Sequence, residues 1–138
     1  MSPRTDIKIG DIYAVCFEGK RNEQSGWRPA VVIQNSLGNT YSKNVVVLPI
    51  TSSETKGNLI THVKISSLDS GLRRDSIVLC ENPVTIPKVF LKKHITTLSE
   101  KYIKDIAVGH TLASGIVGYL SEEEVLDLWM KSREINQR

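Results

Sequence analysis

Arg28 is the residue around which the sequence could organise phosphoryl chemistry. It lies between Trp27 and Pro29 in the stretch NEQSGWRPAVVIQNS, where a polar loop runs into an apolar segment. Proline disfavours the helical region for the residue before it, so Arg28 is expected to enter a buried strand in an extended conformation. A guanidinium fixed in this way can donate two hydrogen bonds to phosphate oxygens and stabilise charge that develops there. The simpler alternative is a surface arginine whose aliphatic stem covers Trp27.

Hydroxyl and carboxyl groups stand at other predicted loops and strand ends. Thr51 and Ser52 close a β-branched run, where a hydroxyl can donate to a phosphoryl oxygen or bond to its own backbone in a turn. Glu23 in the loop before Arg28 and Glu81 after a later strand could accept a proton, although exposed glutamates are usually only solvated.

The remaining reactive side chains match no motif for metal or nucleotide binding. His62, His94 and His110 are scattered, without HxxxH or HxH spacing. Cys16 and Cys80 lack CxxC spacing and lie in apolar stretches, so we expect buried, inert thiols. GxSxG, Walker A and GxGxxG patterns do not occur. The sequence therefore predicts no metal site and no cofactor.

Length and charge limit the class of protein. The chain has 138 residues, of which 40% are hydrophobic, enough for one globular unit with a modest core. Residues 1–99 carry 13 Lys or Arg and 8 Asp or Glu, a net charge of +5, whereas residues 100–138 carry 5 and 7, a net charge of −2. The positive excess suits a polyanionic partner. No signal peptide or membrane anchor is expected, so a cytoplasmic protein is the expectation.

The first two-thirds of the chain must position these groups with β-strands. Short β-branched runs alternate with turns rich in Gly, Asn and Ser, and no helical pattern separates them. This spacing predicts a small barrel or highly curved sheet rather than βαβ units. The expected strands cover residues 10–17, 30–33, 45–50, 62–65 and 76–80, with turn chemistry over residues 35–44.

A helical pattern begins at Ser99. Apolar residues then recur at steps of three and four as far as Leu120, and three glycines in this stretch make a break or kink plausible. Ser121-Glu122-Glu123-Glu124 predicts a capping box, and a second helix is expected to run to about Ile135 with a narrow apolar stripe.

Several stretches in this order together resemble one family. They are GDIYAV, NEQSGWRPAVVIQN, NTYSKNVVVLPITS, THVKI, GLRRDSIVLCENPVTI and ITTLSEKYIKDI. This set is similar to the MazF/PemK family of toxin endoribonucleases, over about Lys8 to Ile106. Judged without the rest of the chain, Arg28 is better explained as a surface arginine, and the resemblance reverses that preference.

The resemblance implies an α+β, mainly β fold, with an SH3-like barrel shared by MazF, PemK and CcdB toxins and with C-terminal helices. It implies a toxin of a type II toxin-antitoxin system that cleaves single-stranded RNA at short sequences without metal, leaving 2′,3′-cyclic phosphate and 5′-hydroxyl ends. A homodimer and a MazE-like protein antitoxin are the implied partners. Residues 1–106 would form the barrel domain, and residues 107–138 a helical extension packed on it.

The resemblance also assigns residues. Arg28 and Thr51 match the catalytic pair, Arg28 neutralising the phosphoryl oxygens and Thr51 donating to the same group. The residues expected to contact the substrate are Glu23, Gln24, Trp27, Asn35, Ser52, Glu81 and Asn82.

Departures from the family pattern leave alternatives open. Val84 stands where many relatives have an arginine, and Trp27 could stack on a base or merely cover the barrel. A degenerate toxin, a non-catalytic binding module and a gyrase-directed toxin of the CcdB type are the alternatives. The helix after Ser121 could pack on its own barrel, join a dimer interface or partly cover a basic groove.

Overall fold

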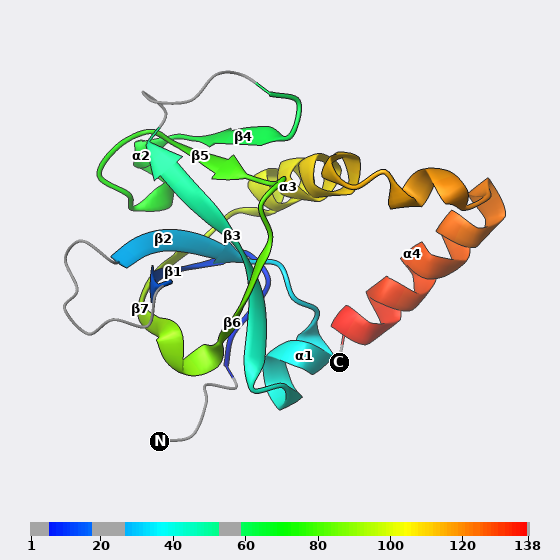
Figure 1. The fold of residues 1–138 in the computed structure, drawn as a ribbon, viewed down its shortest axis with the longest axis horizontal. Helices are drawn as coiled ribbons and strands as arrows, with labels where there is room; N and C mark the ends of the chain where they lie inside the picture. The colour runs from blue at the N-terminus through cyan, green and yellow to red at the C-terminus, as the bar shows by residue number, and fades with distance from the viewer. Residues whose placement is uncertain (1–5, 18–26, 53–58, 138) are drawn as a thin grey trace.

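The computed structural model describes residues 6–17, 27–52 and 59–137. The chain forms a mainly antiparallel sheet followed by a helical C-terminal part (Figure 1). In chain order the elements are β1 Asp11–Cys16, β2 Trp27–Val32, α1 Ser36–Tyr41, β3 Asn44–Ser52, β4 His62–Ile65, α2 Ser67–Ser70, β5 Ser76–Leu79, β6 Val84–Pro87, the 3₁₀ turn η2 Lys88–Phe90, β7 Leu91–Thr97, α3 Glu100–Ala113, the 3₁₀ turn η3 Ile116–Tyr119 and α4 Glu122–Asn136.

The strands pair in the order β4-β5-β3-β2-β1-β7, with β6 added alongside β3, and every pairing is antiparallel. The five strands expected from the sequence are all present, and β2 and β3 are central, as their β-branched runs predict. Two strands, β6 and β7, were not predicted. The order starts at β4 and ends at β7, so the described sheet is an open path of strands and not a closed ring.

Two hydrophobic clusters form as side chains alternate along the strands. Ile12 on β1 belongs to one cluster, while Tyr13 and Val15 belong to the other, because successive side chains point to opposite faces of a strand. The first cluster also takes Ile106 from α3, which packs across β4. Both predicted core thiols, Cys16 and Cys80, are buried and free of disulfides.

The long strand β3 changes partner along its length. Its residues 47–49 pair with β2, whereas its last three residues, Ile50 to Ser52, pair with β5. Beyond Pro49 the strand therefore leaves β2, and the two strands diverge towards the end of the molecule where β2 begins (Figure 1).

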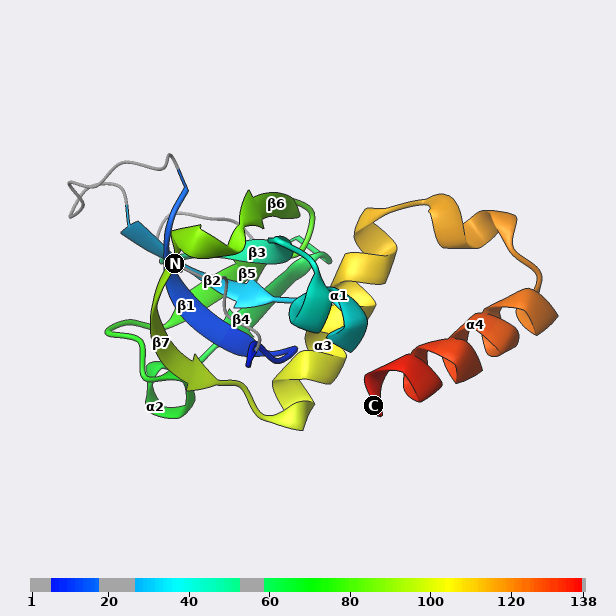
Figure 2. The same cartoon turned by 90° about the horizontal axis from the view of Figure 1, so that it is seen from below.

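The C-terminal part contains two separate helices, because α3 ends at Ala113 before Gly115 and the η3 turn. The predicted capping box is present: Glu124 N donates to Ser121 Oγ at 3.1 Å, and Ser121 N donates to Glu124 Oε1 at 2.9 Å. Figure 2 shows α4 standing apart from the sheet. Within the described residues, no helix combines the length and the apolar character that crossing a membrane requires.

The stretch after β2, expected to be turn only, contains the short helix α1. Asn35 is its N-cap and accepts a hydrogen bond from Gly38 N at 2.9 Å. The buried Lys88 Nζ donates to Gly38 O and Asn39 O at 3.1 and 2.5 Å, which satisfies carbonyls of α1. Burial lowers the pKa of Lys88.

Candidate active site

Arg28 and Thr51 occupy matching positions on the two diverging strands. The β2–β3 ladder pairs Ala30 with Pro49, and stepping two residues outward along each strand leads to Arg28 and Thr51. Because side chains alternate with a period of two, both residues project from the same face as Ala30 and Pro49. The ladder has ended at this point, since Thr51 pairs with Ile77 of β5 and Arg28 with Val15 of β1. The divergence thus leaves space between them.

A cavity of about 1040 Å³ lies between the diverging ends of β2 and β3. It brings together four residues predicted to act in catalysis or substrate binding, Arg28, Thr51, Trp27 and Ser52. Arg28 is exposed, while Thr51 and Ser52 are half-buried. A guanidinium in contact with solvent and a hydroxyl in a partly shielded wall are accessible to a phosphodiester group.

Arg73 and Arg74 line the same cavity, which the sequence did not reveal. They lie in the turn between α2 and β5, where Gly71 ends α2 with a φ of 70° in the left-handed region that favours glycine. Two hydrogen bonds shape this turn: Ser67 N donates to Asp75 Oδ1 at 2.8 Å, and Ser76 Oγ donates to Arg74 O at 2.9 Å.

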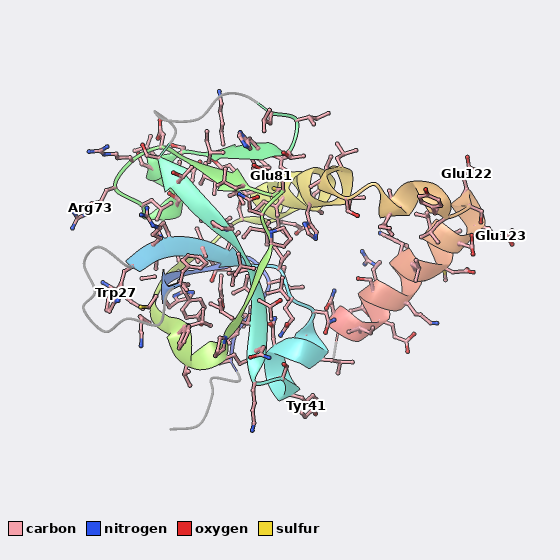
Figure 3. All side chains as sticks on the ribbon, in the orientation of Figure 1. Trp27, Tyr41, Arg73, Glu81, Glu122 and Glu123 are labelled. Atoms are coloured by element: carbon pink, nitrogen blue, oxygen red, sulfur yellow. The ribbon has the colours of Figure 1, made fainter. Side chains whose placement is uncertain are left out.

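The turn is also tied to the C-terminal helix. Tyr102 of α3 donates its hydroxyl proton to Asp69 of α2 at 2.8 Å, and this hydrogen bond raises the pKa of Tyr102. Figure 3 shows Arg73 and Trp27 at the same end of the molecule. In the sequence, the GLRRDS stretch resembles an ordinary charged corner, because only the fold shows that it faces Arg28.

A second cavity of about 360 Å³ continues the first. It shares Trp27, Leu72 and Arg73 with it and adds Lys93 of β7. The lining of the two cavities contains four cationic side chains, those of Arg28, Arg73, Arg74 and Lys93, and no Asp or Glu among the described residues. We call this joined space the cationic groove. Its charge and its aromatic side chain suit a single-stranded polyanion.

Three other predicted substrate residues do not line the groove. Asn35 caps α1, and Asn82 follows β5 in a turn where its backbone N–H donates to Leu79 O at 3.1 Å. Glu81 lies well away from Trp27 and Arg73 (Figure 3). For all three, contact with RNA stays a prediction. Glu23 and Gln24 lie outside the described residues.

Glu81 has protein partners of its own. Thr61 Oγ1 donates to Glu81 Oε1 at 3.0 Å, and His62 Nε2 lies 3.1 Å from Glu81 Oε2. Burial raises the pKa of Glu81, but hydrogen bonds from its own backbone N–H, His62 and Thr61 outweigh burial and hold that pKa below its ordinary value. The proximity of Glu81 to Cys80 adds to burial in raising the pKa of the Cys80 thiol to about 11. A carboxylate of lowered pKa is a weak base, which argues against Glu81 as a proton acceptor.

Comparison with known proteins gives the family. The family model described as "PemK-like, MazF-like toxin of type II toxin-antitoxin system" matches residues 8–109, well over half of the chain. The chain belongs to this family. The matched region contains β1 to β7 and most of α3, and it leaves η3 and α4 outside.

Individual relatives of the PemK and MazF family cover much of the chain. It is 39% identical over 121 residues to an endoribonuclease MazF of Staphylococcus saprophyticus, covering 83% of this chain and 98% of that protein. The Mycobacterium tuberculosis toxin MazF-mt6 superposes with a TM-score of 0.62 at 26% identity, covering 75% of this chain and 94% of that one. A MazE-MazF crystal structure from Deinococcus radiodurans gives a TM-score of 0.64 at 16% identity, over 83% and 98% of the two chains, and shows the shared fold.

Proposed function

We propose that this protein is the toxin of a type II toxin-antitoxin system and that it cleaves single-stranded RNA as a sequence-selective endoribonuclease. The observation that carries the proposal is the convergence of Arg28 and Thr51 on one cationic groove in a chain of the PemK and MazF family. The name of the Staphylococcus saprophyticus relative, endoribonuclease MazF, supports the activity.

The proposed reaction is internal transfer of a phosphodiester, without a metal ion. The ribose 2′-oxygen attacks the adjacent phosphorus and loses its proton, the O2′–P bond forms as the P–O5′ bond breaks, and the departing O5′ takes up a proton. The products are a 2′,3′-cyclic phosphate and a 5′-hydroxyl. DNA lacks the attacking hydroxyl and is spared.

Arg28 and Thr51 stabilise the transition state by charge and hydrogen bonding. Arg28 donates to the non-bridging oxygens as negative charge grows on them, and Thr51 donates to the same group and holds it in line. A guanidinium with a pKa above about 12 is a poor proton donor or acceptor, so electrostatic stabilisation is the role that suits Arg28.

The cationic groove supplies the path for the rest of the RNA. Arg73, Arg74 and Lys93 face the backbone phosphates on either side of the scissile group, and Trp27 offers a ring for a splayed base. Trp27 is 42% exposed, so one part of its ring is accessible for stacking. Ser52 is a further substrate contact in this proposal, together with Glu23 and Gln24 of the loop before β2.

The proposed organisation follows the family. The sheet forms the SH3-like barrel of the family, within a domain of residues 1–106. Residues 107–138 are a helical extension. Two copies of the chain form a homodimer in the cytoplasm. A MazE-like antitoxin neutralises the toxin by blocking the groove. The Deinococcus radiodurans crystal structure is one of MazE with MazF, which supports a protein antitoxin.

Mapping of RNA ends tests the proposed function. The purified protein is incubated with a long single-stranded RNA in EDTA, and the termini are identified by their chemistry. We expect cyclic-phosphate and 5′-hydroxyl ends at a short recurring sequence, and we expect them to disappear in Arg28→Ala. Lys104→Ala is the matched control, because Lys104 is an exposed cation on α3 and does not line the groove.

Two outcomes would reject this function. Cleavage that requires a divalent metal ion would reject the mechanism. Intact RNA together with gyrase inhibition that persists in Arg28→Ala would identify a gyrase-directed toxin instead.

A further inference from the structure

The C-terminal arm, residues 107–137, holds apolar surface that the rest of the described chain does not cover. Ten of the seventeen exposed large hydrophobic residues of the described chain lie in it, between Val108 and Met130. At roughly 100 Å² for a half-exposed side chain of this size, they present on the order of 1000 Å². The four that share one face of α4, Val125, Leu126, Trp129 and Met130, supply roughly 400 Å² of this, about half of the 800 Å² that a standard protein interface buries on each partner.

Helix α4 has 15 residues, and none of them is buried. An isolated helix of that length is marginal in water, since most helical stability in proteins comes from packing. The helix touches the body of the molecule near its C-terminal end, where Ser36 N and Oγ donate to Asn136 Oδ1 at 3.0 and 3.3 Å. This contact leaves most of the helix standing away from the sheet (Figures 1 and 2).

One face of α4 carries a continuous stripe with opposite charges at its two ends. Its members follow at steps of three and one, the spacing that keeps residues on one helix face. They are Glu122, Val125, Leu126, Trp129, Met130 and Arg133. Three of its four apolar residues are more than half exposed, with Leu126 at 54%, Trp129 at 56% and Met130 at 57% of their full accessibility.

We propose that the stripe on α4 docks against the stripe of a second copy of this chain, as an antiparallel helix pair across a two-fold axis. In that arrangement Glu122 of each copy faces Arg133 of the other. Val125 then packs on Met130, and Leu126 packs on Trp129, with the axis between positions 127 and 128. A two-fold contact requires such self-complementarity, because the same surface serves both partners.

Charge complementarity favours a second copy over another partner class. The acidic start of α4 has Glu122, Glu123 and Glu124, while Arg133 lies in its last turn, stacked 5.0 Å from the Trp129 ring centroid. Antiparallel pairing brings the acidic end of each helix to the basic end of the other and also opposes their dipoles. The family model ends at residue 109, so this contact would be additional to any contact made by the barrel.

Cysteine cross-linking of the full chain tests the proposal. Leu126→Cys places a thiol near the proposed axis, and Lys131→Cys places one on the opposite face of the same helix as the matched control. The native Cys16 and Cys80 are buried and do not interfere. Under mild oxidation we expect Leu126→Cys to form a disulfide-linked dimer at low micromolar concentration, and Lys131→Cys to stay monomeric on a denaturing gel. Adding Trp129→Ala to Leu126→Cys should lower the yield by about tenfold, as loss of a buried aromatic anchor does.

Charge reversal checks the predicted pairing in the Leu126→Cys background. Arg133→Glu and Glu122→Lys each place like charges together and should lower the cross-linking yield. An equimolar mixture of these two chains restores opposite charges at both contacts and should recover it. A purely structural role for either residue would give no recovery on mixing.

Absence of the Leu126→Cys dimer, or equal yields at positions 126 and 131, would overturn the proposal. In the Leu126→Cys variant, the introduced thiol could instead stay reactive to thiol reagents in the isolated protein and become protected only when the antitoxin is added. That result would overturn the proposal and assign this face of α4 to the antitoxin. Neither readout depends on RNA cleavage, so failure here leaves the proposed function intact.

Discussion

Thr51 pairs with Ile77 in the sheet and also lines the groove. We therefore expect Thr51→Val to lower the cleavage rate by roughly 10²–10³-fold, the usual cost of losing one donor to a developing oxyanion. The melting temperature should stay near that of the parent protein, because the ladder with β5 remains. Thr51→Ser should keep most of the activity.

Thr85→Val is the matched control for this substitution. Thr85 is an exposed threonine on β6 and lies outside the groove. Thr51→Val cleaving as fast as Thr85→Val in a single-turnover assay would remove Thr51 from the mechanism.

Arg73 and Lys93 are predicted to contact phosphates and not bases. Each alanine substitution should weaken RNA binding about equally for all sequences and should reduce the slope of log K against log salt by about 0.7. Fluorescence anisotropy with a non-cleavable oligonucleotide at several salt concentrations measures that slope. An unchanged slope would place the side chain off the RNA path, and Lys104→Ala provides the baseline.

Glu81 should stabilise the folded protein at neutral pH through its ionised carboxylate. Its folded pKa is lowered, so its ionised form stabilises the native state above its unfolded pKa near 4.5, and this contribution is lost as the pH falls through the folded value. We expect Glu81→Gln to melt at a lower temperature than the parent at pH 7. The difference should shrink as the pH is lowered below about 4.5. A constant difference between pH 7 and pH 3 would contradict this.

The proposed catalytic pair could be selected from the sequence, whereas the rest of the groove could not. Arg28 and Thr51 stand beside proline-containing strand ends and match family motifs. Arg73 and Arg74 reach the groove only because Gly71 and Asp75 set the turn that carries them. Lys93 lies on β7, whose LKKHITT sequence has three consecutive exposed residues and therefore lacks the alternation that indicates a strand.

At the level of elements, α3 depends on Gly109 for its close packing. A Cβ built at Gly109 would lie 3.0 Å from Cys80 Sγ and 3.4 Å from Thr61 O, and the Cys80 side chain is fully buried. Alanine normally favours a helix over glycine by about 1 kcal/mol. Overpacking costs about 1–3 kcal/mol, so we expect Gly109→Ala to destabilise the protein by roughly 1 kcal/mol.

Gly118→Ala is the comparison for this substitution. Among the described residues, apart from its two chain neighbours, no heavy atom lies within 4 Å of a Cβ built at Gly118, so the change should alter stability by less than about 0.5 kcal/mol. Urea unfolding of both variants measures the difference. A stabilised Gly109→Ala would show that α3 can move away from β5 at little cost.

Sequence patterns predicted the elements best where one periodicity dominates. The capping box and the end of α4 agree with expectation to within a residue, because the signals are local. Strand β6 escaped prediction because Pro83 and Pro87 flank a run of three residues. Proline lacks the backbone N–H that a paired strand uses, so these prolines do not indicate a strand. Antiparallel pairing with β3 stabilises β6 here. Helix α1 was hidden in a segment whose Asn, Ser and Gly content is typical of turns.

For the whole molecule, the placement of α4 argues against one predicted role for it. Glu122 and Glu123 lie at the opposite end of the molecule from Trp27 and Arg73 (Figure 3). The helix therefore does not cover the cationic groove of its own chain. Among the described residues, the end of α4 packs against α1 on the body of the molecule.

Truncation after Leu120 tests this separation between the arm and the body. Because no α4 residue is buried, the melting temperature of the truncated chain should fall by no more than a few degrees, and cleavage of RNA should persist. Differential scanning calorimetry and the cleavage assay measure both. A truncated chain that fails to fold would show that α4 belongs to the core of the domain.

The change of partner along β3 has a consequence for how this toxin can diversify. The spacing between Arg28 and Thr51 is set by backbone hydrogen bonds of the sheet, which almost any side chain is compatible with. Residues that contact the bases can therefore be substituted in evolution while the proposed catalytic pair keeps its geometry. Exchanging Trp27 and the loop before it for those of a relative should change which RNA sequence is cut and leave the cutting chemistry as it was.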